Sequence, residues 1–369
     1  MLARHLPPFR ADHVGSLLRP PQVKEARAKS TNGEISQDEL ARCEDEAIEH
    51  VIRKQEEIGL QSVTDGELRR EMWHWDFLAG LDGVQLIELG EGVRFAGVRT
   101  KSRALVVTGK IGVTRAPMLD HFKFVQQRTK HTAKMTIPSP AMLFSVARDW
   151  RPNLNRNVYP NPMAAFDDLA AAYRSVIQQF HDTGCRYLQL DECNLPMLCD
   201  QKYHDQLRQR GDDPDLLIKA FSGLINASLQ GHPTDMAITI HTCRGNFRSK
   251  WMAEGGYDPV AEYLFGSLDV DGFFAEYDTE RSGGFEPLRF LPKNKLLVLG
   301  LVSSKEGDVE SADKIKNRIE QASRYVDLDR ICLSPQCGFS SSEEGNVLTE
   351  DQQWRKLAFV KKVADEVWR

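Results

Sequence analysis

The stretch Ala237-Ile-Thr-Ile-His-Thr-Cys-Arg-Gly-Asn246 decides the fold that we predict for this chain. It starts as an apolar β-strand and ends in His241-x-Cys243, where a loop with a glycine begins. Because side chains alternate along a strand, His241 and Cys243 point to the same side. A second stretch, Ile331-Cys-Leu-Ser-Pro-Gln-Cys337-Gly338, presents another cysteine at a strand end. Imidazole and thiolate groups are the ligands that zinc takes in tetrahedral sites.

Short apolar runs alternate with amphipathic helical segments on both sides of these stretches. The segment from Ser36 to Ile58 is typical, because Ser36 and Glu39 can form a capping box and Gly59 can end a helix. We expect eight strands, at 11–16, 61–67, 133–137, 186–190, 237–243, 272–276, 295–303 and 331–337. Eight strands separated by helices predict a (β/α)8 TIM barrel. A doubly wound sheet is the main rival, but no Gly-x-Gly-x-x-Gly turn follows the first strand.

Residues 81–115 break this alternation. Glycines punctuate runs of alternating polarity there, such as Arg103-Ala-Leu-Val-Val-Thr. The pattern predicts a small antiparallel β excursion between the second and third strands rather than a separate domain. We therefore expect residues 1–369 to form a single domain with a β insertion at 81–115.

The bulk composition excludes several classes of protein. The net charge of −5 and a sequence pI near 6.1 leave no basic excess for nucleic acid or for an anionic membrane surface. No apolar run approaches the roughly 20 residues that span a bilayer, and the N-terminus lacks the apolar core of a signal peptide. The seven cysteines, an odd number, indicate free or metal-bound thiols in a reducing cytoplasm.

The C-terminal ends of barrel strands meet at one site, and here they carry mostly polar side chains. The residues at these ends are Ser16, Asp65, Glu67, Ser139, Asp191, Glu192, His241, Cys243, Glu276, Ser303 and Cys337. His241, Cys243 and Cys337 with one carboxylate make a four-ligand zinc set. We expect Glu276 to be that carboxylate because it directly follows an apolar run, and Glu280 is the alternative. Ligands on separate strand ends favour a metal that activates a substrate thiol over a purely structural zinc.

At these residues the chain resembles the C-terminal catalytic barrel of the cobalamin-independent methionine synthases. The matching stretches are His13-Val-Gly-Ser16, Thr64-Asp-Gly-Glu67-Leu-Arg-Arg-Glu71-Met, Leu188-Gln-Leu-Asp191-Glu192, His241-Thr-Cys243, Phe274-Ala-Glu276 and Ser334-Pro-Gln-Cys337-Gly338. The resemblance implies a zinc methyltransferase that converts homocysteine to methionine with 5-methyltetrahydrofolate as donor. It also implies that His241, Cys243, Glu276 and Cys337 ligate zinc, that Ser16 binds the homocysteine carboxylate, and that Glu67 and Asp191 are catalytic residues that hold its ammonium group.

Two departures from the family concern the methyl donor. The long synthases carry an additional N-terminal barrel that helps to hold the polyglutamate tail, and this chain has only the catalytic half. The family also places a proton-donating histidine near the end of the seventh strand, where this chain has Leu301-Val302-Ser303-Ser304. Demethylation of a tertiary amine needs a proton on the leaving nitrogen. A methylated corrinoid protein or a small activated methyl compound is therefore an alternative donor.

Other functions stay open at this point. A related alkyl-thiol transferase could use another thiol such as coenzyme M, but Glu67 and Asp191 would then lose their proposed purpose. A metal-dependent hydrolase would activate water, and the two thiolates count against it. A catalytically idle barrel with a structural zinc is the remaining alternative. Trp73 and Trp75 could stack on a pterin or simply pack, and we expect Cys193, beside Asp191-Glu192, to be a packing residue.

Overall fold

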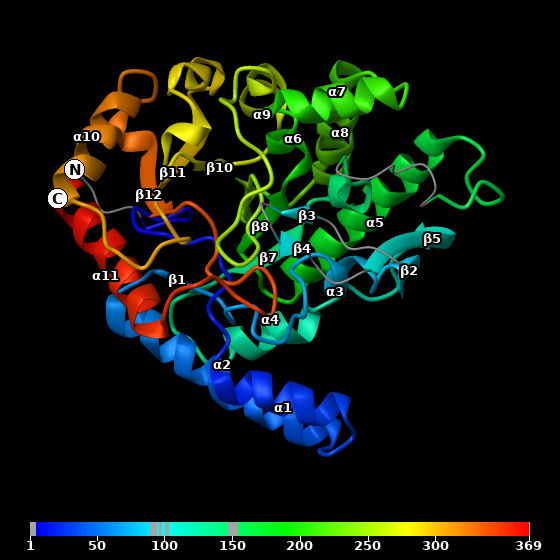
Figure 1. Cartoon of the computed structure of the whole chain (residues 1–369), viewed down its shortest axis with the longest axis horizontal. Coiled ribbons are helices and arrows are strands. Elements are labelled where there is room, and N and C mark those ends of the chain that lie inside the picture. The colour runs from blue at the N-terminus through cyan, green and yellow to red at the C-terminus, as the bar shows by residue number, and fades with distance from the viewer. Residues whose placement is uncertain (1–4, 89–93, 96–97, 100–102, 147–153, 369) are drawn as a thin grey trace.

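The computed structural model describes residues 5–88, 94–95, 98–99, 103–146 and 154–368 of the chain. Its largest sheet has six parallel strands in the order β12-β11-β10-β9-β8-β7 (Figure 1). The strands are β7 (Met135–Pro138), β8 (Tyr187–Glu192), β9 (Ala237–Thr242), β10 (Gly272–Glu276), β11 (Leu296–Val302) and β12 (Ile331–Pro335). Because strands that follow one another in the sequence pair in parallel, each connection must run from the C-terminal end of one strand back to the N-terminal end of the next.

Helices lie around the strands and supply these crossovers, except between β10 and β11, where two 3₁₀ turns stand (Figure 1). The helices are α1 (Pro21–Thr31), α2 (Gln37–Ile58), α3 (Trp75–Leu78), α4 (Leu119–Gln126), α5 (Pro162–Asp182), α6 (Asn194–Met197), α7 (Gln201–Gln209), α8 (Pro214–Leu229), α9 (Ala261–Ser267), α10 (Ala312–Ala322) and α11 (Glu350–Val367). Short 3₁₀ turns are η1 (Pro140–Leu143), η3 (Glu280–Ser282), η4 (Glu286–Phe290) and η5 (Leu328–Arg330). Within the described ranges, no helix is both long and apolar enough to cross a bilayer.

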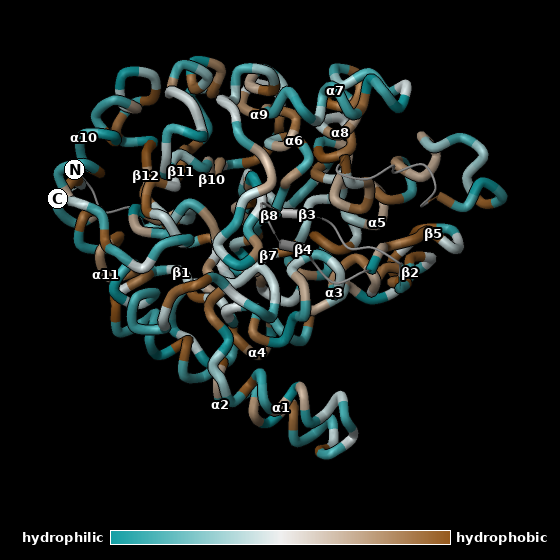
Figure 2. Tube along the Cα trace, in the orientation of Figure 1, coloured by the Kyte–Doolittle hydropathy of each residue, from teal (hydrophilic) through white to brown (hydrophobic). Residues whose placement is uncertain are grey.

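Local sequence signals set the ends of the long helices. The Ser36 side chain accepts a hydrogen bond from the Glu39 amide, and the Glu39 carboxylate accepts one from the Ser36 amide. Gly59 ends α2 in the left-handed conformation, with φ of 86°. The predicted helix with its capping box is therefore confirmed. Figure 2 shows that hydrophobic stretches follow the strands, whereas the outer helices carry many hydrophilic turns.

The described strands do not form the closed eight-stranded sheet of a TIM barrel. The α/β fold with parallel strands is confirmed, but β1 (Ser62–Val63) pairs only with β6 (Thr132–Ala133), in a separate two-stranded sheet. The predicted first strand, 11–16, is reduced to an isolated parallel bridge between Ala11 and Leu333 of β12. Within the described ranges, no ladder joins this segment to β1.

Buried side chains explain why the first segment does not form a regular strand. Three successive carbonyls accept hydrogen bonds from side chains rather than from strand amides: His13 from Lys134 Nζ at 2.6 Å, Val14 from Gln189 Nε2 at 2.7 Å, and Gly15 from Thr64 Oγ1 at 2.7 Å. These contacts satisfy the backbone acceptors that a β ladder would otherwise use. The segment is thus held in place by the polar interior and not by a neighbouring strand.

The antiparallel pairing predicted within 81–115 is present. The strand β2 (Asp82–Glu88) pairs antiparallel with β5 (Arg103–Gly112), and β3 (Arg94–Phe95) pairs with β4 (Val98–Arg99). The rest of the predicted excursion, at 89–93, 96–97 and 100–102, lies outside the described residues. The start of β5 contributes to the site described below.

A glycine in the sheet offers a test of how tightly the strands pack. A Cβ atom added at Gly300 of β11 would lie 2.7 Å from the Cα atom of Gln336 and 3.0 Å from the Ala275 carbonyl oxygen. We expect Gly300→Ala to lower the free energy of unfolding by about 1–3 kcal/mol. Gly223→Ala is the matched control, because Gly223 is exposed on α8 with nothing within 4 Å. It should raise stability by up to about 1 kcal/mol. Urea unfolding of both variants checks the pair, and equal stabilities would contradict it.

Candidate metal centre and substrate cavity

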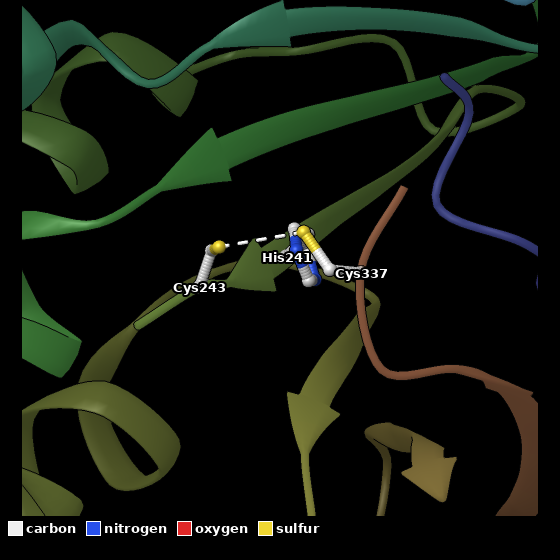
Figure 3. Close-up of side chains that lie close together, drawn as sticks. All are labelled: His241, Cys243 and Cys337. Atoms are coloured by element: carbon white, nitrogen blue, oxygen red, sulfur yellow. Dashed lines mark hydrogen bonds between the residues drawn. The ribbon is translucent and has the colours of Figure 1, made fainter. Parts of the chain in front are cut away.

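His241, Cys243 and Cys337 come together where β9 and β12 end, with their side chains pointing toward one another (Figure 3). His241 lies in β9, Cys243 directly follows that strand, and Cys337 lies two residues after β12. One ligand atom from each residue lies within 4.8 Å of the other two. The two sulfur atoms are 3.4 Å apart, and all three residues are buried.

The state of these side chains fits a metal ion. Both ring nitrogens of His241 are buried without a hydrogen-bond partner, which is unusual for polar atoms in a protein interior. The hydrogen bond with Cys243, together with burial, raises the pKa of Cys337 well above that of an ordinary thiol. A bound cation would reverse this effect, because it stabilises the thiolates. One imidazole and two thiols are a donor set that suits zinc.

Glu276, the predicted carboxylate ligand, lies outside this group of ligand atoms. It is fully buried at the end of β10, and its Oε2 accepts a hydrogen bond from the Arg244 amide at 3.0 Å. Its Oε1 is ion-paired with Arg281. Burial alone would raise the pKa of Glu276, but Lys305, Arg281 and Arg244 hold it below its usual range. The alternative carboxylate, Glu280, is exposed at the start of η3.

Glu67 and Asp191 form a buried pair of acids in the same cavity as His241, Cys243 and Cys337, which we call the metal group. Asp191 lies in β8 directly opposite His241 in the strand register, and Glu67 lies in the turn after β1 with φ of 58°. Burial, followed by the charge of Glu67, raises the pKa of Asp191 to about 8. Burial likewise raises the pKa of Glu67, whose Oε2 is buried without a hydrogen-bond partner. The guanidinium of Arg70 lies 3.5 Å from this Oε2 atom as a buried ion-pair partner, so the oxygen already faces one cation although it accepts no hydrogen bond.

The loop that carries Ser16 approaches the loop after Cys337 closely. The Ser16 hydroxyl accepts a hydrogen bond from the Ser340 amide at 3.3 Å. A Cβ atom at Gly338 would lie 1.9 Å from the Ser16 hydroxyl oxygen, so only glycine lets the loop after Cys337 pass this close. The same loop therefore places both a metal ligand and the neighbour of Ser16.

One cavity of about 140 Å³ collects the predicted residues. Its walls include three residues predicted to bind the amino acid and three predicted to bind metal: Ser16, Glu67, Asp191, His241, Cys243 and Cys337. Glu276 is not among the residues that line it. The structure thus brings six of the seven predicted site residues to a shared space. The seventh, Glu276, is ion-paired with Arg281 and does not line the cavity.

Sequence reasoning did not predict all of the cavity wall. The thiol of Cys193 hydrogen-bonds with Cys243 and lines the cavity, although we expected it to be a packing residue. Its position directly after Asp191-Glu192 was the available signal. Three methionines far apart in the sequence also line the cavity: Met142 in η1, Met197 at the end of α6, and Met252 after β9. A methionine gives no signal in the sequence that separates a cavity wall from ordinary core.

The family is decided by a match along most of the chain. A model of the catalytic domain of the cobalamin-independent synthases covers residues 9–358. The chain belongs to this family. It is therefore a methyltransferase of the methionine synthase type, and the resemblance inferred from the sequence motifs is confirmed.

Relatives in sequence extend over nearly all of the chain. It is 48% identical over 364 residues to the uncharacterized protein YxjH of Bacillus subtilis, which covers 98% of this chain and 95% of that protein. YxjG of the same organism, also uncharacterized, is 49% identical and covers 100% of this chain and 97% of its own. The methionine synthase of Saccharolobus solfataricus is 25% identical over 88% of this chain and 86% of its own.

Solved structures agree with this family. A protein from Listeria monocytogenes, provisionally described as a vitamin-B12-independent methionine synthase, has 40% identity and a TM-score of 0.79. The match covers 99% of this chain and 100% of that protein. A B12-independent methionine synthase from Shewanella in complex with selenomethionine has a TM-score of 0.70 over 97% of both chains. Its identity is 16%, so it supports the fold alone.

The metal group generates a prediction about metal retention. We expect Cys243→Ser and Cys337→Ser each to weaken metal binding at least about 100-fold, because each removes a soft ligand. Cys43→Ser is the control, since Cys43 lies on α2, away from the cavity. Competition with a chromophoric chelator, together with elemental analysis of the purified proteins, measures the affinity. Unchanged affinity in both cysteine variants would show that the metal, if any, binds elsewhere.

The acid pair generates a prediction about pH. An aspartate in the unfolded chain has a pKa of about 4, whereas Asp191 in the folded protein has one of about 8. The folded chain binds this proton more tightly, so the stability it contributes is present below pH about 4 and is lost toward pH 8. We expect the unfolding free energy of the metal-free protein to fall across this window. Asp191→Asn should flatten the fall, and Asp313→Asn, on the exposed surface of α10, should not. Urea unfolding at a series of pH values measures it, and an unaltered slope in Asp191→Asn would contradict it.

Proposed function

We propose that this chain is a zinc-dependent methyltransferase that transfers a methyl group to the thiol of homocysteine and forms methionine. One observation carries this proposal: soft metal ligands and a buried acid pair with an unsatisfied oxygen line the same cavity. A thiol that carries an ammonium group is the kind of substrate that would use both. We also propose that the whole chain is a single domain and that its strands follow the (β/α)8 barrel order around this cavity.

In this proposal, His241, Cys243 and Cys337 hold the zinc ion. Zinc, when bound, keeps a substrate thiol in its thiolate form at neutral pH. Glu276 could act as a fourth ligand only after it separates from Arg281, with which it is ion-paired. Three protein ligands and an open position are typical of catalytic zinc sites.

The acids and Ser16 would orient the amino acid. The Oε2 atom of Glu67 lacks a hydrogen-bond donor, and the substrate ammonium group would supply one. An ammonium group placed between Glu67 and Asp191 would lower the pKa of both, so that binding the amino acid deprotonates Asp191. The Ser16 hydroxyl can donate to the substrate carboxylate while it accepts from the Ser340 amide.

These contacts would prepare the transfer step. The register that sets Asp191 opposite His241 brings the proposed ammonium site beside the metal ligands. The thiolate sulfur then forms a bond to the methyl carbon, and the bond to the donor breaks with its electron pair on the leaving group. The family match gives no support for a methyl-carrier protein as a partner.

The acid pair argues against the alternative acceptors. A thiol without an ammonium group, such as coenzyme M, would leave the Oε2 atom of Glu67 without a hydrogen-bond donor, and it would carry a negative charge toward Glu67 and Asp191. Hydrolysis would favour histidine and carboxylate ligands, whereas the buried group here has two thiols.

Zinc-edge X-ray absorption with selenohomocysteine tests this proposal directly. We expect a zinc–selenium contact to appear on addition, whatever the number of protein sulfurs at the metal. Glu67→Gln should raise the KM for homocysteine about 10- to 100-fold, because a charge-assisted hydrogen bond is lost. Glu320→Gln, exposed on α10, is the control. A metal spectrum that ignores selenohomocysteine would refute the proposed acceptor.

A further inference from the structure

The part of the cavity beyond the metal group has a soft, apolar wall. We call it the methionine chamber and define it by four methionines and two tryptophans that line the cavity: Met72, Met142, Met197, Met252, Trp73 and Trp75. The four thioether side chains are buried, and Trp73 is partly buried. These residues lie in the segments that follow β1, β7, β8 and β9, so the chamber exists only in the folded chain.

The charges around the chamber favour a neutral or cationic ligand. Among the described residues that line the cavity, Arg103 carries the only guanidinium group, and it is ion-paired with Glu71 and Glu88 at 2.6 Å each. The buried carboxylates of Glu67 and Asp191 lie in the same cavity. Indole faces attract cations, and polarizable thioethers tolerate them. Among the described lining residues, a polyanionic donor would meet only the ion-paired guanidinium of Arg103.

The acids available in the cavity also bear on the choice of methyl donor. A methyl group that leaves a tertiary amine nitrogen requires an acid to protonate that nitrogen. Glu67 and Asp191 would both be ionised against the substrate ammonium group, so apart from the proposed metal ligands His74 would be the remaining candidate acid on the described wall. A donor whose leaving group departs as a neutral molecule needs no acid at all.

We propose that the methyl donor is a small methylsulfonium compound bound in the methionine chamber. This inference rests on the proposed function and names the second substrate of the same site. The homocysteine thiolate forms a new S–CH₃ bond, and the S–CH₃ bond of the sulfonium breaks. Its electron pair stays on the donor sulfur, which leaves as a neutral thioether. No proton, oxidant or reductant is consumed.

A comparison of matched donors tests the proposal with the full, metal-loaded chain and homocysteine. The donors are dimethylsulfonioacetate, its quaternary ammonium analogue glycine betaine, and 5-methyltetrahydrofolate. We expect methionine to form at least about 10-fold faster from the sulfonium than from either of the others. Faster transfer from 5-methyltetrahydrofolate would overturn the proposal. So would the absence of transfer from the sulfonium in a protein that still shows the zinc–selenium contact, since that contact tests the acceptor alone.

A variant separates binding in the chamber from general damage. Trp73→Leu should raise the KM for the sulfonium about fivefold, the size expected for one lost cation–π contact. The KM for homocysteine should stay the same, and the zinc–selenium contact should persist. Trp354→Leu is the matched control, because Trp354 lies on α11 and does not line the cavity. An equal rise in both KM values in Trp73→Leu would count against the assigned donor position.

Discussion

The parallel register of β8, β9 and β10 is the constraint on which the whole site depends. Asp191 pairs with His241, and His241 pairs with Phe274, two residues before Glu276. A shift of one residue between β8 and β9 would turn His241 and Cys243 away from the acid pair, because side chains alternate along a strand. The apolar residues of these buried strands resist such a shift. The hydrophobic core therefore fixes the distance between the candidate metal ligands and the acid pair.

The buried acids and thiols of the cavity all have raised pKa values. Burial raises the pKa of Asp191 and of Glu67, although the Arg70 guanidinium opposes this effect at both acids. Hydrogen bonds between neighbouring thiols, together with burial, raise the pKa of Cys243 and Cys337. A metal ion at the thiols and an ammonium group at the acids would each displace protons. Both binding events are then coupled to pH, and each adds positive charge to the same small space. The cavity thus selects for cationic partners before any shape complementarity is considered.

Local signals made part of this architecture predictable, and long-range contacts decided the rest. The capping box at Ser36 and the apolar run before His241 are properties of short segments, so the helix and the candidate metal ligand at this strand end could be predicted from the sequence. The sequence could not show that residues 11–16 form no regular strand, because distant side chains donate hydrogen bonds to the carbonyls of this segment. These donors are Lys134, Gln189 and Thr64. The pattern of residues within the segment does not reveal them. The thiol contact of Cys193 and the methionine wall likewise exist only after distant loops meet.

The pairing of Glu276 with Arg281 bears on how the centre could work. Arg244 directly follows the ligand Cys243, and its amide donates to Glu276, so the carboxylate and the thiol are held by the same turn. To approach a metal, Glu276 would have to give up an ion pair in a buried setting, where the loss is large. A substrate thiolate faces no such competitor. The arginine therefore favours a centre in which the fourth position stays available to an external sulfur, as thiol activation requires.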